Sequence, residues 1–194
     1  MPTNADLAAP VFRMLLCCTR SHVVAVGRAG MVDVVVPVSV RDLTRRDLPS
    51  CAWSGSAVHL ASVARALERA RSGEVEYLAV CPPSDLPVAI GGIDYRSQPG
   101  AGTLWQVAVH PALRSLGLGT ILIRAAEQRI LARGLDRAEL SVEESNPRAR
   151  ALYERLGYVA YGRRRQSWDD EDPNGGVVRY EALCTLMRKP LPGA

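Results

Sequence analysis

The sequence predicts an α+β fold built around one partly antiparallel sheet. Two observations support this prediction: apolar residues alternate along several short segments, as in half-buried strands, and they recur at helical spacing along others. In chain order these segments are a strand, two helices, three strands, a helix, a strand, a helix and two final strands. Strands grouped between helices are typical of an α+β protein. A doubly wound sheet would need strands and helices to alternate throughout.

The regular apolar pattern begins near Met31, whereas residues 1–30 show no steady period. We therefore expect residues 1–30 to be an N-terminal extension and residues 31–190 to form one domain. The valine-rich segment 32–40 is predicted to be its first strand. A hydroxyl and a carboxylate follow at the two ends of Thr44–Asp47, which is the pattern of a capping box at a helix start.

A second helix is expected over residues 59–72, because its apolar residues share one face and Gly73 follows it. Three strands come next, at residues 76–81, 88–95 and 103–109. A proline-rich turn separates the first two of these strands, which predicts an antiparallel hairpin.

The second half of the chain alternates helices and strands before it ends in two strands. A helix is expected over residues 118–133, with Gly134 placed to cap its C-terminus. The remaining elements are a strand at 137–142, a helix that starts at Asn146–Pro147, and strands at 158–167 and 178–187. The acidic run between the last two strands, Trp168–Gly176, is expected to be a loop.

The composition is that of a globular chain, since 47% of the 194 residues are apolar and 23% are charged. The net charge of +4 is dispersed, without the dense basic block of a nucleic-acid-binding surface, so we expect no nucleic acid partner. Five scattered cysteines form neither a disulfide framework nor a metal-binding pattern. We therefore expect free thiols, no metal and a cytoplasmic location. No apolar run has the length of a membrane span, so no membrane partner is expected.

The turn Arg114–Gly119 joins a predicted strand to a predicted helix and contains two glycines. Glycines let the backbone bend and let a ligand approach closely. The helix that follows presents unpaired N–H groups and the positive end of its dipole. The turn is therefore a candidate pyrophosphate site, although a glycine pair before a helix is also common in plain tight connections. The glycine spacing of a Rossmann fold and the Gly-Lys-Ser/Thr of a P-loop are absent.

Two motifs resemble those of the GNAT superfamily of N-acetyltransferases. Val107–Pro111 followed by Arg114–Gly119 resembles motif A, whose core is R/Q-x-x-G-x-G/A. Downstream, Asn146–Tyr158 resembles the second signature, N-x-x-A-x-x-L-Y-x-x-x-G-F/Y. Both occur in the family's order on the expected elements, and two matches are far more specific than one.

The resemblance implies a GNAT fold, a mixed and largely antiparallel sheet of six to seven strands flanked by about four helices, with acetyl-CoA as the acetyl donor. In this family the motif A strand splays from the next strand, often through a bulge, and leaves a cleft for pantetheine. By resemblance, Val107 and Val109 pair with pantetheine through their backbones. The Val109 N–H then faces the thioester oxygen as an oxyanion hole. The implied contacts to coenzyme A are Val107, Ala108, Val109, Arg114, Ser115, Leu116, Gly117, Leu118, Gly119, Thr120, Asn146 and Tyr153.

The resemblance also implies that Tyr153 is the acid that protonates the departing thiolate. Its spacing agrees, because residues recur at i, i+3, i+4 and i+7 from Ala149 to Leu156 and place Tyr153 at the edge of the buried stripe. A core tyrosine with a satisfied hydroxyl is the alternative. Asn146 is predicted to contact the cofactor, to cap the helix, or both.

Direct transfer also needs a base to accept the proton of the amine. Some relatives carry a glutamate five residues before the motif asparagine, where this chain has Ser141. Glu143 and Glu144 end the same predicted strand and are the candidate bases. Alternate strand residues face opposite sides, so one of them is expected to point into the cleft. Solvated strand-end charges are the alternative for both, and Asp94 or a water relay is the alternative base.

The acceptor is expected to be a primary amine on a small molecule or a peptide. In this family the first helices and the final hairpin set acceptor specificity, and here they hold Trp53 and the acidic run that starts at Trp168. With Asp94, these two aromatic residues are the candidate substrate contacts. An acidic loop beside an aromatic ring attracts a cationic amine, although most acidic loops are merely solvated.

Two classes of function therefore fit the sequence. The first is an enzyme that transfers acetyl from acetyl-CoA to a primary amine in a ternary complex, and Tyr153 favours it. The second is a non-catalytic acyl-CoA-binding regulatory module, which the lack of a clear base favours. A homodimer through the sheet edge or the last strands is compatible with this fold.

Overall fold

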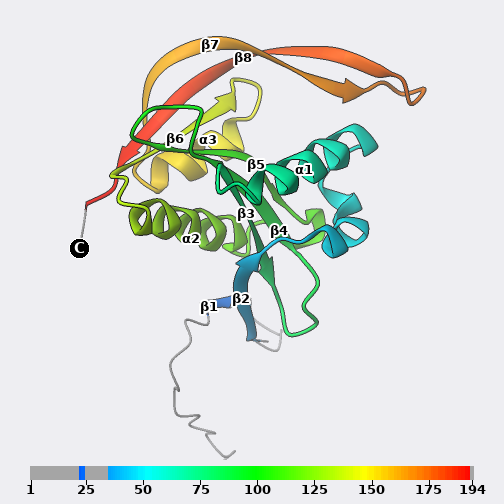
Figure 1. Cartoon of the computed structure of the whole chain (residues 1–194), viewed down its shortest axis with the longest axis horizontal. Helices are drawn as coiled ribbons and strands as arrows, with labels where there is room; N and C mark the ends of the chain where they lie inside the picture. The colour runs from blue at the N-terminus through cyan, green and yellow to red at the C-terminus, as the bar shows by residue number, and fades with distance from the viewer. Residues whose placement is uncertain (1–21, 25–34, 193–194) are drawn as a thin grey trace, which may run out of the picture.

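The computed structural model describes residues 22–24 and 35–192. Within these residues eight strands form one sheet in the order β1-β2-β3-β4-β5-β6-β8-β7 (Figure 1). The strands are β1 (His22–Val24), β2 (Val36–Asp42), β3 (Val75–Cys81), β4 (Ala89–Asp94), β5 (Gly102–Val109), β6 (Arg137–Glu143), β7 (Val159–Glu171) and β8 (Val177–Pro190). The helices are α1 (Ala57–Ala70), α2 (Leu118–Ala132) and α3 (Pro147–Arg155), with 3-10 segments η1 (Arg45–Ser54) and η2 (Pro111–Leu113). None of these described helices combines the length and the apolar character that a membrane span requires.

Neighbouring strands run antiparallel except for β5 and β6, which are parallel. This mixed, largely antiparallel sheet confirms the predicted α+β class and the predicted hairpin of β3 and β4. β1 is additional to the predicted strands. It lies within residues 1–30, the predicted extension, and pairs with β2. The start of the strand predicted at 32–40 lies outside the described residues, and the observed β2 runs on to Asp42.

The sheet separates two apolar layers. On one face α2 and α3 pack against the strands through a cluster that includes Leu122, Ile123 and Tyr153. On the other face η1 and α1 pack against β3 and β4 through a second cluster that includes Val63 and Tyr77. In Figure 1, α2 and α1 lie on opposite sides of β3 to β5. Apolar burial on both faces holds these central strands in place and positions the segments at their ends.

Two predicted helix starts are confirmed by their hydrogen bonds. The backbone N–H and the hydroxyl of Thr44 both donate to Asp47, each at 2.8 Å. The segment that follows is a 3-10 helix and contains Pro49, which has no N–H for an α-helical hydrogen bond. At the start of α3 the Asn146 side chain accepts a hydrogen bond from the Ala149 N–H at 3.1 Å. Asn146 is therefore a helix N-cap, which was one of its two predicted roles.

The predicted loop Trp168–Gly176 is wrong over its first four residues. β7 continues to Glu171 and β8 begins at Val177, so only the short segment 172–176 turns the chain. Aspartate and glutamate are uncommon in strands, which is why the acidic run resembled a loop.

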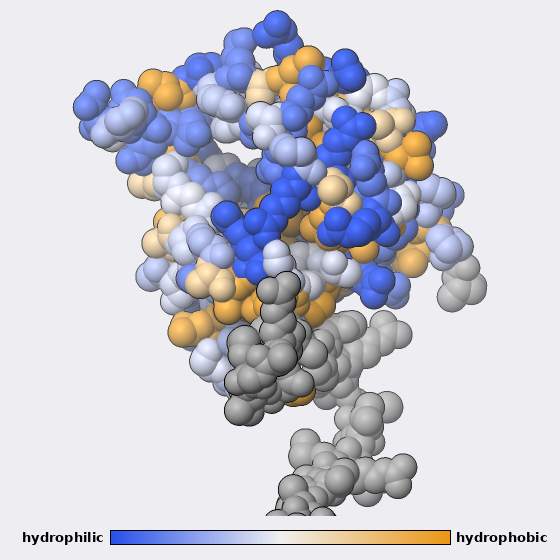
Figure 2. Space-filling model, turned by 180° about the vertical axis from the view of Figure 1, so that it is seen from behind, coloured by the Kyte–Doolittle hydropathy of each residue, from blue (hydrophilic) through white to orange (hydrophobic). Residues whose placement is uncertain are grey.

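Cross-strand pairs continue β7 and β8 past the ends of the other strands of the sheet. The rings of Trp168 and Tyr180 lie opposite each other with their centroids 5.0 Å apart. Asp169 and Arg179 form an ion pair at 3.0 Å. β7 and β8 thus form a long two-stranded ribbon that passes over α1 (Figure 1). Seen from behind, the end of this ribbon projects from the rest of a largely hydrophilic surface (Figure 2).

Candidate functional site

β5 and β6 separate part of the way along their length. They pair only where Gly102–Leu104 run beside Ala138–Leu140. Just beyond, Gln106 adopts a φ of +50° and the register of β5 against β4 shifts, which is a β-bulge. Ala108 and Val109 then continue along β4 without pairing to β6. The splayed strand and the bulge that the resemblance implied are both present.

The amide of Val109 points toward the side that β6 has left. His110 donates its N–H to the carbonyl of Val88, the residue before β4, at 2.9 Å, so the His110 amide points toward β4. In an antiparallel ladder the next residue turns its N–H and C=O the other way. The Val109 N–H is therefore a donor directed away from β4, into the gap between β5 and β6.

Side chains hold the bulge in place from the α1 side. Tyr77 donates its hydroxyl to the Gln106 side-chain oxygen at 3.3 Å, and the Gln106 amide donates to Ser62 at 3.2 Å. Sequence reasoning missed Gln106, because nothing in the local sequence predicts a positive φ at a glutamine. The two contacts connect β5 to β3 and α1 at the bulge.

The turn Arg114–Gly119 leads from the gap into α2. Gly117 is the N-cap of α2 with a φ of +84°, and a Cβ added there would meet nothing within 4 Å. Ser115 also has a positive φ, of +68°. The space beside Gly117, immediately before the first turn of α2, is therefore open, and the N–H groups of that turn have no partner within the helix, as an anion site requires.

A second arginine reaches this turn from α3. Arg148 donates to the Ser115 hydroxyl at 2.6 Å, and Arg114 donates to the Val109 carbonyl at 3.5 Å. Sequence reasoning missed Arg148, although its place two residues after the motif asparagine was an available signal. Two guanidinium groups and a helix N-terminus therefore meet at one turn, which suits a ligand with several phosphates.

The start of α2, the end of β5 and α3 contact one another. A Cβ built at Gly119 would lie 3.2 Å from Leu152 and 3.6 Å from Val109. Glycine is therefore needed at this position for close packing. It brings the turn and the Val109 amide beside the helix that carries Tyr153.

Tyr153 is 8% exposed, and its ring packs edge-on against Tyr158 with the centroids 6.0 Å apart. Burial raises the pKa of Tyr153 to about 12. The phenol therefore remains protonated at neutral pH and can donate a proton but not accept one. This state fits the acid role expected for Tyr153, which stays a prediction.

Each candidate base already has a protein partner. Glu143 accepts hydrogen bonds from Ser145 at 3.2 Å and from the Tyr180 hydroxyl at 3.3 Å. Glu144 pairs with Arg163 at 3.0 Å. The base role of Glu143 or Glu144 therefore stays a prediction, and either glutamate would have to exchange a contact to take it.

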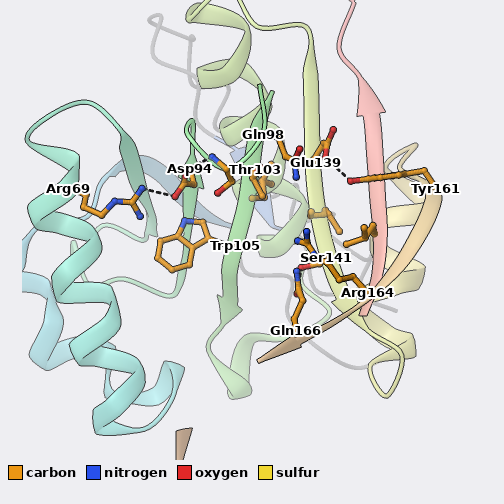
Figure 3. A pocket seen from close by; sticks show the side chains of 14 residues that line it. Arg69, Asp94, Gln98, Thr103, Trp105, Glu139, Ser141, Tyr161, Arg164 and Gln166 are labelled. Carbon is orange, nitrogen blue, oxygen red and sulfur yellow. Dashed lines mark hydrogen bonds and ion pairs between the residues drawn. The ribbon is translucent and has the colours of Figure 1, made fainter. Parts of the chain in front are cut away.

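A cavity of about 430 Å³ lies where β5 and β6 still pair, on the α1 side of the sheet. Its lining comes from α1, β4, β5, β6, β7 and β8 and includes Asp94, Trp105, Glu139 and Arg164 (Figure 3). Sequence reasoning missed Glu139. The signal was the alternation along β6, which places Glu139 and Ser141 on one face.

Of the predicted substrate contacts, only Asp94 lines this cavity. Trp53 packs against the His110 ring with the centroids 5.3 Å apart, and Trp168 packs against Tyr180 in the ribbon. Trp168 follows Gln166, a lining residue, by two positions on β7. Substrate contacts by Trp53 and Trp168 stay predictions.

The acidic run is engaged in the structure itself. Asp170 lies 3.4 Å from the Ser56 hydroxyl, and Glu171 accepts a hydrogen bond from the Ala57 N–H at 3.1 Å. Asp172 accepts the N–H groups of Asn174 and Gly176 in the turn, each at 2.8 Å. The contacts of Asp170 and Glu171 attach the ribbon to the N-terminus of α1. The attraction of a cationic amine by the acidic run stays a prediction.

Comparisons with known proteins agree with this geometry. The sequence profile of the acetyltransferase (GNAT) family matches residues 44–158, more than half of the chain. A segment of 58 residues, 30% of the chain, is 46% identical to the mycothiol acetyltransferase of Beutenbergia cavernae and spans 20% of the length of that relative.

Solved structures of this fold cover most of the chain. The ribosomal-protein-S18-alanine N-acetyltransferase from Escherichia coli matches with a TM-score of 0.60 and 22% identity over 81% of this chain and 96% of that chain. PaiA N-acetyltransferase from Thermoplasma acidophilum, in complex with coenzyme A, matches with a TM-score of 0.57 and 15% identity over 79% and 98%. The chain therefore belongs to the acetyltransferase (GNAT) family.

Proposed function

We propose that this protein is an acetyl-CoA-dependent N-acetyltransferase that moves the acetyl group directly to a primary amine in a ternary complex. One observation carries the proposal: the gap between β5 and β6 has the Val109 N–H directed into it and opens beside the anion-binding turn Arg114–Gly119. A ligand with a pyrophosphate at the turn can reach the gap with an extended arm. Coenzyme A has this form, and the structure of a relative in complex with coenzyme A supports the choice.

The chain's own residues fit the needs of acetyl transfer. When bound, acetyl-CoA supplies the thioester whose acetyl group moves. The Val109 N–H would donate to the thioester oxygen as the amine attacks, where negative charge develops. The backbone from Ser115 to Thr120 and the Arg114 and Arg148 side chains would hold the phosphates. The other cofactor contacts that the resemblance implies lie at the end of β5, in the turn before α2 and at the start of α3.

Tyr153 would donate its proton to the thiolate sulfur that leaves. Its pKa of about 12, raised by burial, keeps the phenol protonated over the physiological range. The amine would lose its proton to Glu143 or Glu144, directly or through water. Glu143 is the first candidate, because its partners are neutral hydroxyl groups rather than an arginine.

Calorimetric titration with acetyl-CoA tests the proposal, with NAD and ATP as controls. Wild-type protein should bind acetyl-CoA with a Kd in the micromolar range, on the order of the substrate affinities of most enzymes. Gly117→Ala should weaken this binding at least tenfold, because the methyl group would occupy the space before the first turn of α2.

Gly134→Ala is the matched control at the other end of α2. Gly134 has a φ of +73° and, like Gly117, no atom within 4 Å of an added Cβ. Both variants should lose a similar ~1–2 kcal/mol of folding stability through left-handed strain. Only Gly117→Ala should lose acetyl-CoA affinity. No binding by wild type, or an equal loss in both variants, would contradict the proposal.

A non-catalytic acyl-CoA-binding module is the second candidate, and the protein partners of Glu143 and Glu144 favour it. Release of free thiol from acetyl-CoA in the presence of a panel of primary amines separates the two functions. An enzyme releases thiol in proportion to the amine acetylated, whereas a binding module binds acetyl-CoA and releases none.

We also propose a cytoplasmic location. Cys51, Cys81 and Cys184 are buried free thiols, as in a reducing compartment. Burial raises the pKa of the Cys51 thiol to about 11, so it remains an unreactive thiol at neutral pH.

A further inference from the structure

We propose that the 430 Å³ cavity receives an amine acceptor that also carries a carboxylate, and that Arg164 binds this carboxylate. This inference rests on the proposed acetyltransferase function and adds the chemical class of the acceptor. It follows from the charges that line the cavity and from the partners each of them already has.

The first acidic group, Asp94, is fully engaged. Arg69 of α1 donates to its side chain at 2.8 Å, and the backbone N–H groups of Arg96 and Ser97 donate at 2.8 and 3.0 Å. Burial acts to raise the pKa of Asp94, but the Arg69 and N–H hydrogen bonds outweigh it and lower that pKa. Asp94 therefore stays ionised, and its charge is balanced by Arg69.

The second acidic group, Glu139 of β6, is also engaged. It is 7% exposed. Tyr161 donates its hydroxyl to Glu139 at 2.8 Å, and Arg137 pairs with Glu139 at 2.9 Å. With both carboxylates satisfied by protein groups, neither offers an open site for a cationic acceptor.

Arg164 of β7 differs from both. It lines the same cavity, and among the residues that the structure describes no carboxylate lies within salt-bridge distance of it. Figure 3 places Arg164 beside Ser141 and Gln166, across the cavity from Arg69 and Asp94. A further cation, Arg188, lies close to Tyr161, with its guanidinium carbon 5.1 Å from the ring centroid. The unbalanced charge at the cavity is therefore positive, and a carboxylate is the group that an arginine fork binds best.

The position of the cavity sets the length of the acceptor. Trp105 lines it, and Val109 follows four residues later on the same strand. For a fully extended strand this separation would be at most roughly 13 Å, and the bulge at Gln106 shortens it. An acceptor with its carboxylate at Arg164 and its amine at the Val109 amide has to extend along this segment, so we compare short peptides with a single amino acid.

Thiol release from saturating acetyl-CoA tests the inference with glycine, diglycine and triglycine, each compared with its carboxamide. We expect the free acids to have KM values about tenfold below those of their amides, with the largest difference for triglycine. Arg164→Gln should raise KM for the acids about tenfold and leave KM for the amides nearly unchanged. Arg164→Lys should restore part of the preference, because it keeps the charge and loses the fork.

Arg165→Gln is the matched control. Arg165 is the next residue of β7, is exposed and does not line the cavity, so its loss should leave the acid preference intact. Amides that serve as well as acids, or an equal effect of the two substitutions, would overturn the inference.

A binding measurement covers the case in which none of these amines is acetylated. N-acetyl-triglycine and its carboxamide are titrated into the wild-type protein saturated with coenzyme A. Tighter binding of the acid that Arg164→Gln removes would support the inference, and equal or absent binding of the two would overturn it. If acetyl-CoA itself fails to bind in calorimetry, the proposed function fails instead, so the two failures are distinguishable.

Discussion

The two sides of the opening between β5 and β6 consist of different groups, mainly backbone amides on one side and side chains on the other. On the α2 side the candidate site consists mainly of backbone N–H groups from one continuous segment, Val107–Thr120. On the α1 side the cavity is built from side chains of α1, β4, β5, β6, β7 and β8, held by ion pairs such as Arg69–Asp94. A site made of backbone depends on glycines and helix starts, which are local in sequence. A site made of distant side chains depends on the whole fold.

The largest effect should come from Tyr153, the proposed acid on the α2 side. We expect Tyr153→Phe to lower kcat about 100-fold or more, because the leaving thiolate loses its proton donor. Acetyl-CoA affinity should change little, since the phosphate contacts remain. Steady-state thiol release, with calorimetry for binding, measures the two effects separately.

The pH profile of the wild type sharpens this prediction. A phenol at its ordinary pKa of 10.0 would begin to lose its proton near pH 9, whereas the pKa of Tyr153 is raised by burial to about 12. The acid is active when protonated, so kcat should show no alkaline fall below pH 10. Tyr158→Phe is the control, because Tyr158 is buried in the same cluster and has no assigned chemistry. A similar fall in kcat for both variants would show that packing, rather than proton donation, is what Tyr153 provides.

An ion-pair cluster on the α1 side makes the stability of the fold sensitive to acid. Arg41 of β2 pairs with Asp47 of η1 at 2.8 Å and with Asp85 at 2.7 Å. The Arg41 hydrogen bonds lower the pKa of Asp47 from 3.8 to about 2. A carboxylate whose pKa is lowered by folding stabilises the fold at pH values above its pKa in the unfolded chain. For Asp47 this contribution is lost as the pH falls from about 4 to 2.

Asp47→Asn should therefore cost about 1–2 kcal/mol of unfolding free energy at pH 7 and should flatten the loss of stability between pH 4 and 2. Urea unfolding at several pH values measures both effects. Asp85→Asn should cost less, because its side chain is 73% exposed and its pairing is screened by water. An equal cost for the two substitutions would mean that the ion pair contributes no more in η1 than at the surface.

The same contrast explains how much of the molecule could be predicted from sequence. The helix start at Thr44 and the cap at Asn146 are local patterns, and both are confirmed. The bulge at Gln106 depends on contacts to Tyr77 and Ser62, which lie far away in the sequence, so only the resemblance to a family suggested it.

The ribbon and the cavity were harder to predict for the same physical reason. The pairing of Trp168 with Tyr180 extends β7 through a run whose composition favours a loop. The partners of Asp94 and Glu139 come from other elements, so their charges could not be recognised as already balanced. Local hydrogen bonds are encoded by spacing, whereas cross-strand and cross-layer contacts are encoded only by the fold.

Arg148 is an exception on the α2 side, since it is a side chain from a distant helix that reaches the backbone-built turn. We expect Arg148→Gln to raise the Kd for acetyl-CoA about fivefold, equivalent to roughly 1 kcal/mol. Arg150→Gln is the control, because Arg150 pairs with Glu154 along α3 at 2.8 Å. Calorimetry at low and high salt measures the difference, which should shrink at high salt. Equal Kd values for the two variants would place the phosphate contacts on the backbone alone.

The smallest effect is expected where the ribbon meets α1. Glu171 accepts the Ala57 N–H at 3.1 Å, so a carboxylate lies at the positive end of the α1 dipole. Glu171→Gln keeps the shape and removes the charge, and it should lower the unfolding free energy by about 0.5 kcal/mol. Glu181→Gln on β8 is the control, because Glu181 is exposed and lies opposite Ser167 rather than over α1. Paired urea titrations at low salt resolve this difference. If Glu171→Gln instead raised the acceptor KM and left stability unchanged, the acidic run would act on the acceptor rather than as a fastening of the ribbon.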